Sequence, residues 1–490
     1  MIRQRGSVAA VAALLVLCSP PPPASAVAFP MVDPGALPPN GPPGPGQEMR
    51  QNGACSIYGA LPGFDPMAVP PSQAMLNLPE AWKSSRGAGV TVGIIDSGVA
   101  PQARLPNLAP GGDYIDPAAS GLTDCDGHGT VIAGLIGGAP GPDGFSGVAP
   151  DAGLISVRQS SAQWSPRVPS GGDPQQVKTA GDVLTLARAI RHLADMPGVR
   201  VINISEIDCF PAYKPVDQAA LGAALYYAFV VKDIVVVAAA GNTGEGNCNT
   251  SNPLTDPTHP EDPRNWLGAT MISTPSYWQP YVLSVASLTP AGQPSGFTMA
   301  GPWVDIAAPG ELIVSLGNGP NSGLVNGQPS SQQPLVAING TSFATAYVSG
   351  VAALVRSKYP TLSAHQVVNR LMASAHNPAR SPSNLIGAGV IDPVAALTWE
   401  IPDGDALPSQ MPVMRIAPPP PPPRDDPWPR VIAFGAGVAA IAGAVITVTV
   451  LRMRRDGKAD GHEVPTTNWP TAVHTLSTRT AAPTVQSQVR

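Results

Sequence analysis

Short runs of apolar and β-branched residues recur along the middle of the chain and predict the strands of a buried parallel sheet. These runs lie at residues 90–95, 153–158, 199–204 and 234–239. Strands that are covered on both faces have nearly continuous apolar sequences, whereas a half-exposed strand alternates apolar and polar residues. Apolar segments of helical length follow several of these runs. The pattern therefore predicts an α/β fold with a mainly parallel central sheet.

The start of the chain carries a shorter apolar segment of another kind. Arg3 and Arg5 precede an apolar run at 8–17, and small residues at 24–26 provide a cleavage site. A positively charged start, a short apolar core and a small-residue site are typical of a secretory signal peptide, which we expect at residues 1–26.

A second apolar segment lies near the other end, at residues 431–451. It runs for about twenty residues without a charge, enough to cross a bilayer core of about 30 Å as one transmembrane helix. A buried core helix is the alternative, and it fits poorly beside the arginines that follow at 452, 454 and 455. The positive-inside rule places residues 27–430 outside the cytoplasmic membrane and the tail at 452–490 in the cytoplasm.

Proline-rich segments flank the predicted globular part. Residues 27–74 form an N-terminal extension without clear helix or strand periodicity, which we expect to wrap the surface of that part. Residues 401–430 contain the proline run 418–423, which favours an extended polyproline helix of about 3.1 Å per residue. This run is either a spacer above the membrane or a motif for proline-binding modules, and its predicted place outside the membrane favours a spacer.

Composition narrows the class of function. The 490 residues carry a net charge of −5, which gives no reason to expect nucleic-acid binding. No internal repeat is apparent, and residues 75–400 are numerous enough to bury one large core.

Cysteine usage fits an exported protein. Removal of Cys18 with the signal peptide leaves an even number of cysteines and predicts two disulfides, with free thiols or a zinc site as alternatives. Cys209 and Cys248 both follow predicted parallel strands at the same edge of the sheet, so we expect them to be bonded. Cys55 then pairs with Cys125, which ties the extension to the loop before a candidate catalytic histidine.

Two side chains with catalytic potential stand where these elements begin or end. Asp96 directly follows the run at 90–95, so its carboxylate lies at the carboxyl edge of the sheet, where open α/β sheets carry their sites. His128 lies between Gly127 and Gly129 at the start of an apolar helix, and small neighbours leave its ring free to contact a serine and a carboxylate. Taken singly, each residue is more often structural than catalytic.

A serine and an asparagine supply the remaining parts of a candidate site. Ser342 lies in the small-residue run 339–345 ahead of an apolar helix, so it stands at a helix N-terminus, where free backbone N–H groups can stabilise an oxyanion. Asn242 follows the strand at 234–239, and its amide could donate a second hydrogen bond to the same oxyanion.

The order of Asp, His and Ser along the chain resembles that of the subtilisin-like serine proteases. The resemblance covers residues 75–400 and includes the segment 144–150 after the histidine helix and the turn 307–310 before the serine. It implies a three-layer subtilisin-like domain that hydrolyses peptide bonds.

The resemblance also implies a role for each of the four side chains. These are Ser342 as nucleophile, His128 as general base and then acid, Asp96 as the residue that orients the histidine, and Asn242 as oxyanion donor. No cofactor is implied, and no metal-ligating residues are assigned. The carboxylates of the long loops at 160–178 and 247–276 leave a calcium site open, although they lack the regular spacing of a calcium-binding loop.

Three positions, in two segments, differ from the usual pattern of that family. Val131 stands where many relatives carry a second histidine, three residues after the catalytic one. Glu206 and Ile207 follow the tripeptide 203–205, where many relatives have Leu-Gly on the substrate-binding strand. An acidic side chain there either changes the peptide preference or points to solvent, so the cleavage specificity stays open.

The succession of signal peptide, proline-rich extension, protease core, proline stalk, single span and short tail resembles the mycosins. These are membrane-anchored proteases of mycobacterial type VII secretion systems. The resemblance implies exported proteins of such a system as substrates and its membrane components as partners. Two functions stay open: an endopeptidase that cleaves exported proteins, and an envelope scaffold that stabilises the secretion complex while its protease activity is dispensable for secretion.

Overall fold

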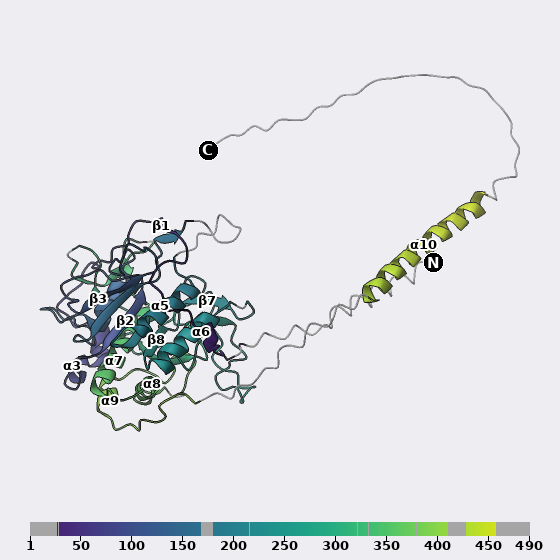
Figure 1. The fold of residues 1–490 in the computed structure, drawn as a ribbon. Helices are drawn as coiled ribbons and strands as arrows, with labels where there is room; N and C mark the ends of the chain where they lie inside the picture. The colour runs from purple at the N-terminus through teal and green to yellow at the C-terminus, as the bar shows by residue number, and fades with distance from the viewer. Residues whose placement is uncertain are drawn as a thin grey trace, which may run out of the picture. The chain divides into compact units, whose positions relative to one another are not determined.

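In the described part of the chain, a seven-stranded parallel sheet forms the centre of the first structural unit, Met1–Ser409 (Figure 1). Its strand order is β11-β10-β8-β6-β2-β4-β3, and every neighbouring pair is parallel. The strands are β2 (Thr91–Asp96), β3 (Leu108–Asp113), β4 (Gly153–Arg158), β6 (Val199–Ile204), β8 (Val235–Ala239), β10 (Leu283–Leu288) and β11 (Val304–Pro309). This sheet confirms the predicted α/β fold, and all four predicted runs belong to it.

The structure is a computed structural model that describes residues 27, 29–167, 180–214, 216–320, 322–331, 333–378, 381–409 and 428–456. The predicted signal peptide, the proline run of the stalk and nearly all of the predicted cytoplasmic tail lie outside the described residues.

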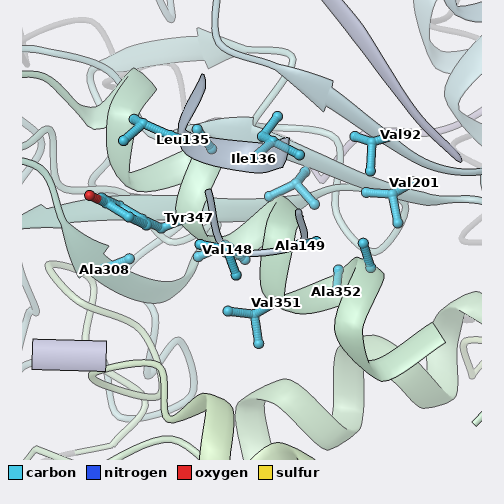
Figure 2. Packing of buried hydrophobic residues seen from close by; sticks show 14 of the residues in the cluster. Val92, Leu135, Ile136, Val148, Ala149, Val201, Ala308, Tyr347, Val351 and Ala352 are labelled. Atoms are coloured by element: carbon cyan, nitrogen blue, oxygen red, sulfur yellow. The ribbon is translucent and has the colours of Figure 1, made fainter. Parts of the chain in front are cut away.

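Helices cover both faces of the central sheet, which makes the three layers. One face packs on α4 (His128–Gly137), α7 (Thr341–Lys358), α8 (Ala364–Ala373) and α9 (Pro393–Thr398), and the other on α5 (Val183–Asp195) and α6 (Ala219–Tyr226). Successive side chains of a strand point to opposite faces, so Ile94 joins the first cluster and Ile95 the second. Figure 2 shows Val92 of the sheet together with Leu135 of α4 and Val351 of α7 in the first cluster.

Smaller elements surround this core among the described residues. Antiparallel pairs join β1 (Met49–Gln51) to β5 (Trp164–Pro166), β7 (Asp208–Pro211) to β9 (Met271–Thr274), β12 (Ser315–Leu316) to β13 (Leu324–Val325) and β14 (Gly327–Gln328) to β15 (Val336–Ala337). The short helices are η1 (Pro34–Ala36), α2 (Pro71–Leu76), α3 (Leu78–Ala81) and the π-helical turn η2 (Tyr227–Val231).

The N-terminal extension lies against this unit at several separate places. Val27 is buried in an apolar cluster, and the ring of Phe29 lies 5.0 Å from that of Trp266. Farther along, β1 pairs with β5 in the loop that follows β4. The extension therefore takes its path from tertiary contacts, which agrees with the expectation that it wraps the surface.

Two disulfides join described residues. Cys209 is bonded to Cys248 with a Cα–Cα distance of 5.0 Å, and Cys55 to Cys125 with 4.4 Å. Both pairs are the expected ones, the first from the strand ends and the second by elimination. Beside the second bond, the N–H of Ser56 donates to the carbonyl of Cys125 at 2.8 Å, so the extension is held to the loop that leads into α4.

Asp233, which lies between η2 and β8, supplies the carboxylate that neutralises the buried side chain of Arg356 in α7. The side chain of Arg356 is 1 % exposed and donates to both Asp233 carboxylate oxygens, at 3.2 and 3.3 Å, and to the Asp233 carbonyl at 2.6 Å. We expect Asp233→Asn to lower the free energy of unfolding by about 3 kcal/mol, since removing one partner leaves a buried charge uncompensated. Chemical denaturation of the purified protein measures this loss.

The matched control for that prediction is Arg200→Ala. Arg200 donates to the same carboxylate at 2.9 Å, but its side chain is 35 % exposed, so its loss should cost less than about 1 kcal/mol. Asparagine tolerates the left-handed backbone of position 233 (φ 57°), so the first variant tests charge and not backbone strain. Equal losses in the two variants contradict the explanation.

The second structural unit, Gln410–Arg490, contains one described helix, α10 (Trp428–Asp456), which includes the predicted span. No helix among the residues described here is long and apolar enough to cross a membrane. The transmembrane segment at 431–451 therefore stays a prediction.

Candidate active site

Asp96 is the last residue of β2, and its side chain is fully buried. Its Oδ1 accepts a hydrogen bond from the N–H of Ser97 at 2.7 Å and lies 2.7 Å from Nδ1 of His128. Because an ionised carboxylate can only accept, this contact places a proton on Nδ1 of His128. Nε2 of the neutral ring is then free to accept another proton.

The glycines on either side of His128 are required by close packing. Gly127 has a φ of 84°, and a Cβ there would lie 2.5 Å from a ring carbon of Tyr58. A Cβ on Gly129 would lie 2.0 Å from the carbonyl oxygen of Gly98. Gly129 thus lets α4 begin against the segment that follows β2, which brings the histidine to the aspartate, and Gly127 leaves room for Tyr58.

Asp124, a further residue of this site, fixes the turn before α4. Its Oδ1 accepts from the N–H of Gly127 at 2.7 Å, and its Oδ2 accepts from the N–H and the hydroxyl of Thr130 at 2.9 and 2.6 Å. Burial raises the pKa of Asp124 to about 6 although these hydrogen bonds oppose the shift. An Asp shortly before an apolar helix was the sequence signal that could have identified this residue.

Ser342 is the second residue of α7, and the ring of the next residue, Phe343, lies 5.3 Å from the His128 ring. The Ser342 hydroxyl donates to the carbonyl oxygen of Ser205 at 2.9 Å. Its proton is thereby directed away from the histidine, and rotation about the Cα–Cβ bond is needed for reaction. Catalytic hydrogen bonds are often misaligned in this way before substrate binds.

A buried chain of hydrogen bonds, also not foreseen, ties Ser205 to α7. Nδ2 of Asn203 donates to Oγ of Ser205 at 2.8 Å, and the hydroxyl of Ser349 donates to Oδ1 of Asn203 at 2.9 Å. All three side chains are buried, so each polar group needs the next one as its partner. The chain holds the end of β6 beside the nucleophile candidate.

Thr341 orients the amide of Asn242. Oδ1 of Asn242 accepts from the N–H and the hydroxyl of Thr341 at 3.0 and 2.9 Å, while its Nδ2 donates to Glu245 at 2.8 Å. An N–H can only donate, so this pattern identifies the oxygen and the nitrogen of the amide. Nδ2 lies beside Gly340, 3.5 Å from where a Cβ would stand, at the start of α7. The donor atom is thus near the expected position but is engaged by Glu245.

Several carboxylates near His128 affect its pKa. Oε1 of Glu206 lies 3.8 Å from Nδ1 of His128. Burial lowers the pKa of His128, but the charge of Asp96 and its hydrogen bond, with the charges of Glu206 and Asp124, outweigh burial and raise it. Burial, followed by the charge of Asp96, raises the pKa of Glu206 to about 7. The surrounding carboxylates therefore stabilise the imidazolium that forms when His128 accepts a proton.

Asp96, His128 and Glu206 also form a candidate metal-ligand group, with one donor atom from each lying within 4.8 Å of the others. The donors are not independent, because Asp96 and His128 already share a hydrogen bond of 2.7 Å. Binding an ion through Nδ1 would require that hydrogen bond to be broken. The arrangement suits proton transfer better than metal binding.

Comparison with known proteins now places the chain among its relatives. The profile of the Subtilase family (Peptidase_S8) matches residues 87–389. Mycosin-3 of Mycobacterium tuberculosis (strain ATCC 25618 / H37Rv) is 56 % identical over 88 % of this chain and 94 % of its own length. Mycosin-1 of Mycolicibacterium smegmatis (strain ATCC 700084 / mc(2)155) is 45 % identical over 90 % of this chain and 98 % of its own.

Solved structures give the same result. The MycP3 protease from the type VII (ESX-3) secretion system matches with a TM-score of 0.72 and 58 % identity, covering 76 % of this chain and 100 % of that one. A chain in the periplasmic assembly from the ESX-5 inner membrane complex matches with a TM-score of 0.73 and 46 % identity, covering 81 % and 100 %. The protein described here therefore belongs to the subtilase family of serine proteases and, within that family, to the mycosins.

Proposed function

We propose that this mycosin is a serine endopeptidase in which Ser342 is the nucleophile, His128 the general base and Asp96 the residue that orients it. The observation that carries the proposal is the 2.7 Å contact between Asp96 and His128 at the carboxyl edge of the sheet, with Ser342 at the adjoining start of α7. Hydrolysis of peptide bonds needs a nucleophile, a base and an oxyanion site, and the neighbourhood offers all of them.

In the proposed reaction, the Ser342 hydroxyl leaves the Ser205 carbonyl and attacks the scissile carbonyl carbon. Its proton passes to Nε2 of His128, and Asp96 stabilises the imidazolium that forms. The proton then moves to the leaving amine, and water hydrolyses the acyl-enzyme by the reverse route.

The oxyanion of the tetrahedral intermediate takes hydrogen bonds from the backbone N–H of Ser342 and from Nδ2 of Asn242. The backbone donor is available because the first N–H groups of a helix have no intrahelical acceptor. Nδ2 of Asn242 must first leave Glu245, to which it donates at 2.8 Å. One donor of this kind contributes about 2.7–4 kcal/mol of transition-state stabilisation.

Covalent labelling tests the assignment. We expect a fluorophosphonate to label the purified protein once per chain, and peptide mapping to locate the adduct on Ser342. Denatured protein is the control, because an accessible but unactivated serine does not react. An adduct on another serine, or no labelling of the folded protein, overturns the proposed role.

The rate of that labelling should rise with pH, with a midpoint above 6.5, the ordinary pKa of histidine. His128 accepts a proton only when neutral, and the charge of Asp96 together with Glu206 raises its pKa against the effect of burial. Rate constants measured from about pH 5 to about pH 10 give the midpoint. A midpoint at or below 6.5 contradicts the electrostatic argument.

We place this activity at a type VII secretion system, with exported proteins as substrates and membrane components as partners. Support comes from the relatives, which include a chain of the ESX-5 inner membrane complex. A scaffold role is the second candidate, because that relative is part of an assembly. A strain with Ser342→Ala, assayed for both substrate cleavage and total secretion, separates the two: lost cleavage with normal secretion favours the scaffold.

The proposed topology follows from the two ends of the sequence. A signal peptide at 1–26 and a span at 431–451 anchor the protease region, 75–400, outside the membrane through the stalk. Protease added to intact spheroplasts should digest an epitope near Pro420 and spare one near Arg490. Digestion of the epitope near Arg490 after lysis of the spheroplasts is the positive control for protease activity. The opposite protection pattern contradicts the orientation.

A further inference from the structure

Glu206 is a half-buried carboxylate that must share its cationic partner. Its side chain is 38 % exposed, and among the described residues its ion-pair partner is Nδ1 of His128 at 3.8 Å. That nitrogen already contacts Asp96 at 2.7 Å. No lysine or arginine within the described ranges forms an ion pair with Glu206.

The surroundings of Glu206 carry an excess of negative charge. Asp96 and Asp126 both raise its pKa in addition to the effect of burial. Arg158 does not compensate Glu206, because its side chain is 1 % exposed and its ion pair is with Asp113 at 3.6 Å. A site with this excess of negative charge attracts a positively charged group of a ligand.

Glu206 also lies where a substrate must pass. It follows Ser205, whose carbonyl oxygen receives the Ser342 hydroxyl at 2.9 Å. Residues 205–207 continue from the end of β6 outside any strand pairing, so their backbone groups can pair with an extended peptide. A side chain of that peptide, within a few residues of the scissile bond, then faces the Glu206 carboxylate.

From this placement we infer that Glu206 selects substrates that carry a lysine or arginine near the scissile bond. The inference rests on the proposed function and names the substrate class of the same site. A basic side chain supplies a charge-assisted hydrogen bond to a carboxylate whose ion-pair partner is otherwise the shared histidine. A neutral side chain of equal length leaves the carboxylate without that partner.

The experiment uses the purified full-length chain at about pH 8, where a carboxyl group with a pKa of about 7 is largely ionised. Peptidyl phosphonates carry lysine or norleucine in turn at each of the positions before the reactive phosphorus, and the rate of Ser342 labelling is measured. At one position we expect lysine to react about tenfold to a hundredfold faster than norleucine. In Glu206→Gln this ratio should fall to about one.

Two further variants sharpen the test. Glu80→Gln, on the surface where Glu80 pairs with Lys83 at 2.6 Å, should keep the preference for lysine. Glu206→Lys should reverse it in favour of a glutamate-bearing phosphonate. Equal slowing of all probes in Glu206→Gln would mean that Glu206 acts only through His128, and this overturns the inference, as does a ratio of one in the unaltered protein.

If the proposed protease function itself is wrong, the labelling experiment gives a different result. If neither the peptidyl phosphonates nor a small fluorophosphonate label Ser342, the nucleophile is wrongly assigned, and the inference falls with it. If the small fluorophosphonate labels Ser342 but no probe shows a preference for lysine, only the specificity role of Glu206 is refuted.

Discussion

Replacement of Ser342 by alanine is expected to lower the turnover number for peptide hydrolysis by about 10⁶-fold, the usual cost of losing the nucleophile from a triad. The structural cost should be small. The hydroxyl makes one hydrogen bond, to the Ser205 carbonyl at 2.9 Å, and a bond of this type contributes about 1 kcal/mol to stability. Hydrolysis of a fluorogenic peptide and thermal unfolding, measured on the same preparation, separate the two effects.

The matched control is Thr345→Val, one turn farther along α7. It removes a hydroxyl that donates to the Thr341 carbonyl at 2.8 Å and keeps the side-chain volume nearly constant. Its turnover should stay within about tenfold of the unaltered protein, because the group is not a donor to the reacting atoms. Activity that survives in Ser342→Ala, or an equal loss in Thr345→Val, would show that the nucleophile lies elsewhere.

Replacement of Asp96 by alanine is expected to lower turnover by about 10⁴-fold while Ser342 remains in place. The carboxylate holds the Nδ1 proton of His128 at 2.7 Å, so its loss frees the ring to adopt the wrong tautomer or orientation. It also removes the leading charge that raises the pKa of His128 against burial. The pH midpoint of the residual activity should therefore move to lower pH.

Asp126→Asn is the control for a general loss of negative charge. Asp126 lies in the loop that leads into α4, close to His128, but accepts hydrogen bonds from Ser161 and Ala162 and not from the histidine. Its replacement should change turnover by less than about tenfold. If both variants lose activity equally, the loss follows from removing negative charge near His128 and not from losing the residue that orients it.

The sequence predicted the central sheet well because strands buried on both faces must be apolar throughout. β4 and β6 begin and end at the predicted residues, and β2 differs by one residue at each end. Once β2 is located, Asp96 necessarily lies at the carboxyl edge, since parallel strands end on the same side. The disulfide between Cys209 and Cys248 followed from the same geometry.

The residues that surround the candidate site could not be predicted as well from the sequence. The chain from Asn203 through Ser205 to Ser349 consists of ordinary polar residues whose roles arise only when distant segments meet. Asn203 and Ser349 are 146 residues apart. No local pattern encodes a hydrogen bond across such a separation, because its partners are selected by packing of β6 on α7.

The sequence by itself determined the fold class, the paired cysteines and the candidates Asp96, His128, Ser342 and Asn242, because each depends on local composition or on the shared edge of a parallel sheet. The tertiary structure alone decided how these side chains point. It directs the Ser342 hydroxyl to Ser205 and brings Glu206 within 3.8 Å of His128. Rotamers and charge contacts of this kind depend on packing between elements far apart in the chain, so no pattern along the sequence could specify them.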